Sequence, residues 1–85
     1  PAYDIVLFLG LYQHLPKTSR KNTLLAALSL ANVWFAIRTP QSIWQSDKLE
    51  EFIEQQGFHL AEHSKADLDR QGGLYIYQRT NPKQA

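Results

Sequence analysis

The residues of this chain that could do chemistry follow two short apolar runs. The run Ile5–Leu9 leads into Gly10–His14, and the run Val33–Arg38 leads into a polar stretch. In open α/β sheets, ligands bind in the crevice beyond the carboxyl ends of the strands. If both runs are strands, Gly10–His14 and Arg38–Trp44 lie at such an edge, and a binding site is expected there.

Two histidines, His59 and His63, stand four residues apart. On a helix this spacing would suit a pair of metal ligands, but the sequence around them alternates like a strand. Four residues of a strand span roughly 13 Å, which is too far for two side chains to hold one ion. We therefore expect solvent-facing histidines and no metal site.

Charged residues give two further signals. Lys17, Arg20 and Lys21 lie at the expected start of a helix, where the helix dipole disfavours cations. An anionic ligand or an RNA backbone could use them, but a solvated surface is the better interpretation because the whole chain is near neutral. Asp67 and Asp69 lack the further ligands and the spacing of a calcium loop.

The composition predicts one small folded domain. The chain has 85 residues, 44% of them hydrophobic, no cysteine and a formal net charge of +1. A core of this size is marginally stable, and without cysteine neither a disulfide nor a cysteine zinc site can reinforce it. The charge gives no electrostatic case for nucleic acid as a partner. No apolar run is long enough to span a membrane, so we expect a cytoplasmic protein.

The first half of the chain is predicted to form a strand, a helix and a strand. Tyr3–Gly10 and Val33–Arg38 are apolar without alternation, which indicates strands covered on both faces. Between them, Ser19–Ala31 has helical periodicity, with Ser19 or Thr18 as a possible N-cap. Asn32 can close this helix, because asparagine tolerates the left-handed conformation.

A second helix is predicted after a polar connection at Gln41–Ser46. Asp47 and Glu50 have the spacing of a capping box, in which the first residue caps the helix and the second reaches back to it. Gly57 stands where a glycine commonly ends a helix.

The chain then closes with two strands, Phe58–His63 and Leu74–Arg79, joined by a polar loop from Ser64 to Gly73. Strands linked by a helical crossover run parallel, whereas two strands linked by a loop run antiparallel. We therefore expect an α/β fold with a mostly parallel four-stranded sheet and a C-terminal antiparallel hairpin. The polar tail, residues 80–85, is expected to be disordered.

With these elements placed, the sequence resembles class I S-adenosylmethionine-dependent methyltransferases from their fourth strand to their end. Tyr3–Gly10 with Tyr12–Pro16 is similar to the family's (F/Y)D-x-V … H-x-L-P stretch on that strand and its exit loop. The exit Arg38–Pro40 and the passage Leu49–Phe58 also look like the family. The closing hairpin is the family's topological hallmark, with Gly73–Tyr77 as its final strand. The resemblance implies a partial methyltransferase-like domain over residues 1–79.

The same resemblance implies roles at the carboxyl edge. Gly10 and Leu11 would flank the cofactor. The residues that would face the methyl acceptor are Tyr12, Gln13, His14, Arg38 and Trp44. The alternative is that Tyr12 and Trp44 are packing aromatics and that His14 is bonded to nearby backbone.

The sequence departs from the family in its glycines. Members bind the cofactor with a glycine-rich turn after their first strand and an acidic residue ending the second. This chain has four glycines, none of them in a Gly-x-Gly turn between a strand and a helix. The resemblance therefore implies the C-terminal portion of a methyltransferase, active on an unidentified acceptor only when joined to the missing cofactor-binding half. S-adenosylmethionine is expected in that intact parent and not on this chain alone.

The missing half also has a consequence for Ile5–Leu9. In the family the fourth strand pairs with the first, so here it would become an apolar sheet edge without charge or proline, and such an edge recruits another strand. A homodimer through Ile5–Leu9 would satisfy both edges. The alternative function is then a non-catalytic homodimeric binding module derived from this fold. A third hypothesis is an unrelated α/β domain with the same element order.

Overall fold

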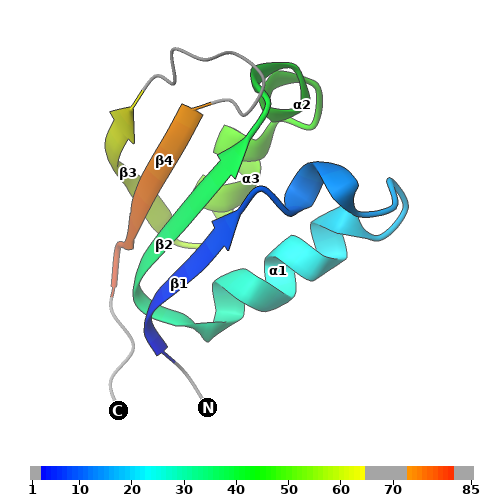
Figure 1. Cartoon of the computed structure of the whole chain (residues 1–85). Helices are drawn as coiled ribbons and strands as arrows, with labels where there is room; N and C mark the ends of the chain where they lie inside the picture. Colours follow the sequence, from blue (N-terminus) through cyan, green and yellow to red (C-terminus); the bar gives the residue numbers. More distant parts are fainter. Residues whose placement is uncertain (1–2, 65–72, 82–85) are drawn as a thin grey trace.

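The computed structural model describes residues 3–64 and 73–81, which form a four-stranded sheet with helices packed on one face (Figure 1). The strands are β1 (Tyr3–Leu9), β2 (Ala31–Thr39), β3 (Phe58–Ser64) and β4 (Gly73–Arg79). The helices are the 3₁₀ helix η1 (Tyr12–His14), α1 (Arg20–Leu30), α2 (Gln41–Ser46) and α3 (Leu49–Gln55). The small α/β domain and its element order are therefore as predicted, with η1 and α2 as additional short helices.

The strand order in the sheet is β1-β2-β4-β3. Only β1 and β2 pair in parallel, whereas β4 pairs antiparallel with both β2 and β3. The prediction of a mostly parallel sheet is therefore wrong. The reason is the position of β4, which reverses direction after β3 and is inserted between β2 and β3, so that two of the three pairings become antiparallel. The antiparallel closing pair and the edge position of β1 are confirmed.

The core lies between the sheet and the helices. Its centre is Phe35 of β2, which is fully buried, with its ring centroid 6.0 Å from that of Phe8 and 6.3 Å from that of Phe58. Two of the helices, α1 and α3, add four fully buried or nearly fully buried side chains, Leu24 and Leu28 of α1 with Leu49 and Ile53 of α3. Within the described residues, no helix is long and apolar enough to cross a membrane.

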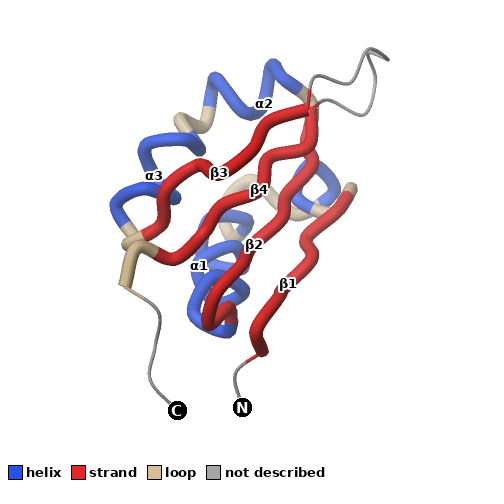
Figure 2. The backbone as a smooth tube through the Cα atoms, turned by 90° about the vertical axis from the view of Figure 1, so that its left-hand side faces the viewer, coloured by secondary structure: helices blue, strands red, loops and turns tan. Residues whose placement is uncertain are grey.

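The opposite face of the sheet carries no helix among the described residues, and Figure 2 looks onto it. Ile5 and Leu7 are 57% and 63% exposed there, whereas Phe8, one residue along β1 and on the core face, is 6% exposed. The prediction that the first strand is covered on both faces is therefore wrong. We call this surface the open face; its residues in register are Ile5, Leu7, Leu9, Trp34, Ala36, Arg38, Leu74, Ile76 and Gln78.

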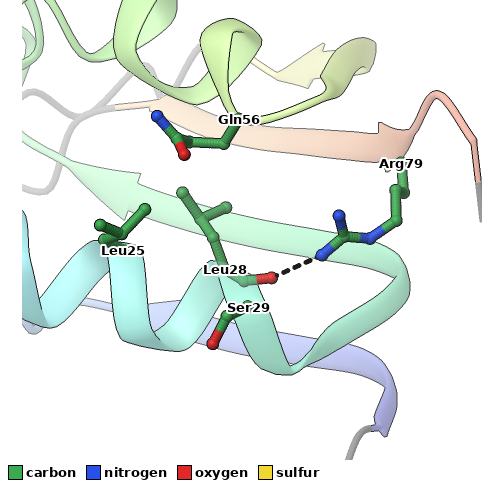
Figure 3. Close-up of a pocket in the computed structure, with 5 residues that line it drawn as sticks. All are labelled: Leu25, Leu28, Ser29, Gln56 and Arg79. Carbon is green, nitrogen blue, oxygen red and sulfur yellow. Dashed lines mark hydrogen bonds between the residues drawn. The ribbon is translucent and has the colours of Figure 1, made fainter. Parts of the chain in front are cut away.

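The two ends of α1 differ from the sequence prediction. Ser19 precedes the helix but makes no side-chain capping bond, and the helix passes directly into β2, so that Asn32 lies in the strand. The closure by Asn32 is therefore wrong. Arg79 of β4 caps the helix instead: its Nε donates to the carbonyl oxygen of Ala31 at 2.8 Å and its Nη2 to that of Leu28 at 2.9 Å (Figure 3). A cation at this end also matches the negative end of the helix dipole.

The capping box predicted for the second helix is also wrong. Gln41–Ser46 forms α2 instead of a polar connection, and α3 begins only at Leu49. Lys48 precedes α3 at φ 53°, in the left-handed region, and no side chain caps the helix. The helix does end before Gly57, whose φ of +90° requires the freedom of glycine.

Instead of capping a helix, the carboxylate of Asp47 binds two side chains that are distant in the sequence. It accepts hydrogen bonds from Arg20 Nε at 2.8 Å, from Arg20 Nη2 at 2.9 Å and from the Tyr12 hydroxyl at 2.6 Å. We call these three side chains the Asp47 network. The bonds from Arg20 lower the pKa of Asp47, while burial and the bond to Asp47 raise the pKa of Tyr12. The network joins η1, the first turn of α1 and the junction between α2 and α3.

Replacing Asp47 tests how much the Asp47 network contributes to the free energy of unfolding. Asp47→Asn is expected to reduce the free energy of unfolding by about 2–3 kcal/mol, because an amide nitrogen then faces the donors of Arg20 and Tyr12. Urea denaturation measures the change. Asp4→Asn, the same substitution at an exposed site on β1, is the matched control and should stay within about 0.5 kcal/mol.

A pH dependence is expected for the difference in stability between the native chain and Asp47→Asn. Because the folded pKa of Asp47 is lowered, its stabilising contribution is present above the unfolded pKa of about 3.9 and is lost as the pH falls through the folded pKa. The stability difference between the native chain and Asp47→Asn should therefore shrink below about pH 4. A difference that stays constant in acid would contradict an ionised Asp47 in the folded protein.

Arg79 offers a second stability test. Arg79→Met is expected to cost about 1–3 kcal/mol, because it removes both bonds to the carbonyl groups of α1 and the guanidinium that lies 4.4 Å from the centroid of the Phe58 ring. Arg79→Lys keeps the charge without the fork and should lose less. Equal losses in the two variants, measured by thermal unfolding, would assign the effect to packing instead of helix capping.

Candidate functional site

The carboxyl ends of β1 and β2 meet beside η1 at one edge of the sheet (Figure 1). An open pocket of about 370 Å³ lies there, and we call it the edge pocket. Its described lining residues are Leu9, Gly10, Gln13, His14 and Arg38. The structure thus brings together four residues that the sequence analysis placed at this edge, Gly10, Gln13, His14 and Arg38.

Backbone contacts fix the walls of the edge pocket. The parallel register places Leu9 opposite Arg38, and the Gly10 N–H donates to the Arg38 carbonyl oxygen at 3.2 Å. Gly10 has φ +69°, a conformation that side-chain-bearing residues rarely adopt, and it turns the chain out of the sheet into η1. The His14 N–H then donates to the Leu11 carbonyl oxygen at 3.0 Å. Gln13 and His14 are therefore held on a short, hydrogen-bonded helical turn.

The Gln13 side chain is tied to the neighbouring strand. The hydroxyl of Thr39, a fully buried residue next to Arg38, donates to Gln13 Oε1 over a long 3.4 Å. The Oε1 atom of Gln13 accepts from this hydroxyl, and its amide nitrogen carries two further N–H donors. This contact links η1 to the end of β2.

The edge pocket is equipped for binding. Arg38 carries a positive charge with several N–H donors, and the His14 imidazole can take part in hydrogen bonds. Its described lining residues contain no carboxylate and no nucleophilic hydroxyl or thiol. A Ser–His–acid arrangement or a pair of carboxylates is therefore not present among these residues.

Two aromatic residues that the sequence analysis placed at this edge lie in the core instead of the edge pocket. Tyr12 is fully buried in the Asp47 network. Trp44 is 4% exposed and its ring stacks on Tyr75, with the centroids 3.8 Å apart. The alternative interpretation, packing aromatics, describes both positions. Leu11 is 52% exposed and does not line the edge pocket.

The two histidines of β3, His59 and His63, lie on opposite faces of the sheet. His59 pairs with Gln78 and His63 with Tyr75, three residues apart on β4, so their side chains point to opposite faces. His59 Nδ1 lies 3.2 Å from Thr80 Oγ1, and the His63 ring stacks on Tyr75. Within the described parts of the chain, no group of three His, Cys, Asp or Glu side chains could hold a metal ion. Asp67 and Asp69 lie outside the described residues.

The three basic residues at the start of α1 do not act together. Arg20 is buried and bound to Asp47, while Lys17 and Lys21 are exposed. A hollow of about 330 Å³ lies beside them, lined by Lys17, Thr18, Arg20, Lys21 and Asp47. Because the carboxylate of Asp47 is part of this hollow, its field opposes that of the cations. The hollow is a weaker anion site than the charge of its three cations suggests.

A smaller cavity of about 190 Å³ lies between α1 and the end of α3 (Figure 3), and its lining residues are Leu25, Leu28, Ser29, Gln56 and Arg79. The guanidinium of Arg79 faces the carbonyl groups of α1, where it serves as the helix cap. This cavity is therefore explained by the packing of the helix end.

Sequence reasoning missed two residues that shape the site. Leu9 was assigned to the buried interior of a strand, and Asp47 was assigned to a helix cap. No local pattern reveals the partner of Asp47, since Arg20 stands 27 residues away. The position of Leu9 directly before Gly10 could have indicated that this residue lies at the exposed end of β1.

The chain matches no protein-family model, no curated protein and no solved structure. The comparisons thus assign neither a family nor an activity to it. The function must be argued from the fold and the edge pocket.

Proposed function

We propose that this chain is the C-terminal portion of an S-adenosylmethionine-dependent methyltransferase, which transfers a methyl group to an unidentified acceptor when it is joined to a cofactor-binding half. The observation that carries the proposal is the closing hairpin. Its last strand, β4, is inserted antiparallel between β2 and β3. A closing hairpin is the hallmark of the family that the sequence resembles from residue 3 to residue 79.

The edge pocket gives further support. In the proposed assignment Gly10 and Leu11 lie on the cofactor side, and Gln13, His14 and Arg38 lie on the acceptor side. All of these residues except Leu11 line one pocket at the carboxyl ends of two parallel strands. This is the place where open α/β sheets bind ligands. Tyr12 and Trp44 then support the acceptor side through packing instead of contact.

The cofactor is assigned to the intact parent. An acidic side chain that could bind the ribose hydroxyls is missing from the described lining of the edge pocket, and Gly10 leads into a 3₁₀ helix of three residues, which has too few free N–H groups to replace a glycine-rich turn. This chain alone is therefore proposed to bind no S-adenosylmethionine. We retain the cytoplasm as the proposed location.

The full reading frame that encodes this chain provides the test. Upstream of Tyr3 it should encode a strand, a Gly-x-Gly turn and a helix. Its complete product should bind S-adenosylhomocysteine with a Kd of about 1–100 µM in titration calorimetry. Residues 1–85 alone, folded by circular dichroism, should give no binding heat. A complete product without binding would end the proposal, and micromolar binding by residues 1–85 would show that the cofactor site is wrongly placed.

A second candidate, a homodimeric binding module, is favoured by the free edge of the sheet. Among the described residues, β1 pairs with β2 on one side only, and its open-face residues Ile5, Leu7 and Leu9 are 45–63% exposed. The strand interior carries no charge and no proline between Ile5 and Leu9, the devices that normally block edge pairing. Two copies that pair β1 with β1 about a two-fold axis would extend the sheet and satisfy both edges.

Sedimentation equilibrium tests this second candidate. The native chain should dimerise, and Leu7→Lys should weaken the dimer about tenfold or more, because a charge on an edge strand opposes pairing. Leu60→Lys places the same charge on β3, the other edge strand, at a side chain that is 39% exposed. This matched control should leave the dimer unchanged. A folded native monomer at about 100 µM would eliminate the dimer through β1.

A further inference from the structure

The open face changes from apolar to polar across the sheet. At the free edge, β1 presents Ile5, Leu7 and Leu9, which are 45–63% exposed. The apolar surface continues onto the two central strands, where the register places Ala36 and Ile76 in one row with Leu7. We call this surface the apolar patch; it consists of Ile5, Leu7, Leu9, Trp34, Ala36, Leu74 and Ile76.

The other border of the open face is polar. The register with β4 places His59, Glu62 and Ser64 of β3 on this face, and all three are exposed. Arg38 and Gln78 border the apolar patch at opposite ends of the central strands. The apolar patch therefore lies off centre, because polar residues bound it on three sides and its fourth side is the free edge of β1. A partner that covers it completely must extend past that edge.

A dimer through β1 would join two apolar patches into one surface. Edge strands that pair antiparallel are related by a two-fold axis perpendicular to the sheet, so both open faces stay on the same side. The two apolar patches then meet at the axis, and the two β3 strands form the outer borders of the combined sheet. An apolar centre with a polar rim is the layout of a protein–protein interface. Pairing of β1 alone leaves this joined surface in water.

The area of the apolar patch indicates what can cover it. Three strands about 4.8 Å apart, with three alternate residues about 6.8 Å apart on each, occupy roughly 300 Å². A stable interface takes about 800 Å² of accessible surface from each partner, so the patch of a single chain is too small. The joined surface of a dimer has about twice the projected area, and its accessible area is larger because the side chains stand out from the sheet. It is therefore close to the size that a stable interface needs.

We propose that the open face binds further copies of this chain: two dimers formed through β1 pack their joined apolar patches against each other. The result is a tetramer with two sheets inside and the helices outside. Stacked sheets of this kind lie about 10 Å apart with interdigitating side chains. Each copy contributes the same surface, so the assembly closes with dihedral symmetry. This tetramer rests on the second candidate function, the dimer through β1, and adds the partner of that dimer.

Sedimentation equilibrium tests the tetramer. Over about 5–500 µM, the native chain should fit a dimer–tetramer equilibrium with a Kd of about 10–100 µM. Ile76→Lys places a charge in the apolar patch on a central strand, so it should weaken the tetramer about tenfold or more and keep the dimer. Ser64→Lys adds the same charge to the same face outside the apolar patch and should leave the tetramer unchanged. A tetramer that Ile76→Lys does not weaken would overturn the proposal.

Tryptophan fluorescence gives a second measurement, which needs no variant. Trp34 is half-buried in the apolar patch, whereas Trp44 lies in the core, stacked on Tyr75. These are the two tryptophans of the chain. Acrylamide should therefore quench the emission of Trp34 in the dimer and quench it less in the tetramer. Quenching that stays constant while the tetramer forms would place the interface elsewhere and overturn the proposal.

The same experiments distinguish failure of the tetramer from failure of the dimer. A dimer at every concentration would keep the pairing through β1 and remove the tetramer. A folded monomer at every concentration would remove both, because the joined surface exists only in the dimer.

Discussion

The fold of this small domain depends on one carboxylate. Asp47 lies between two short helices and accepts two hydrogen bonds from Arg20 at the start of α1, one from Tyr12 in η1 and a long one from the neighbouring Ser46. Tyr12 and Arg20 stand 35 and 27 residues from Asp47 in the sequence, so the bonds connect η1 and the start of α1 to the junction of α2 and α3. This domain has no disulfide and only a small core, so the loss of one partner from this largely buried charged cluster is expected to be costly for its stability.

The network also explains why the edge pocket has a defined shape. η1 carries Tyr12 on its buried side and Gln13 and His14 on the side of the pocket. Because the Tyr12 hydroxyl is fixed by Asp47, the short helix cannot rotate without breaking a buried hydrogen bond. Gly10 sets the direction in which the chain enters this turn, and Thr39 holds Gln13 from β2. The donors of the edge pocket are therefore positioned by the core behind them.

The open face and the free edge of β1 belong together. β1 is the last strand on one side of the sheet, and every second side chain from Tyr3 to Leu9 points to the face without helices. Apolar side chains that stay in contact with water at an unprotected edge favour association, either with a cofactor-binding half or with a second copy. The two proposed functions differ in which of these covers the strand, and both would use the same exposed surface.

The positions of most strands and of α1 could be predicted from the sequence, because continuous apolar runs and helical periodicity depend on local residue types. The carboxyl-edge residues Gly10, Gln13, His14 and Arg38 could be predicted as neighbours for the same reason: once two strands are parallel, their ends meet. The strand order and the exposure of β1 could not, because an apolar run looks the same whether one face or two are covered.

The sequence by itself determined an α/β domain with an apolar first strand and a closing antiparallel pair. The tertiary structure alone decided that β4 is inserted between β2 and β3, which makes the sheet mostly antiparallel. It also decided that Asp47 binds Arg20 instead of capping a helix, and that Arg79 caps α1 across 48 residues of sequence. The physical reason is the same in each case. A hydrogen-bonding group takes the partner that packing brings to it, and local spacing contains no information about partners that are distant in the chain.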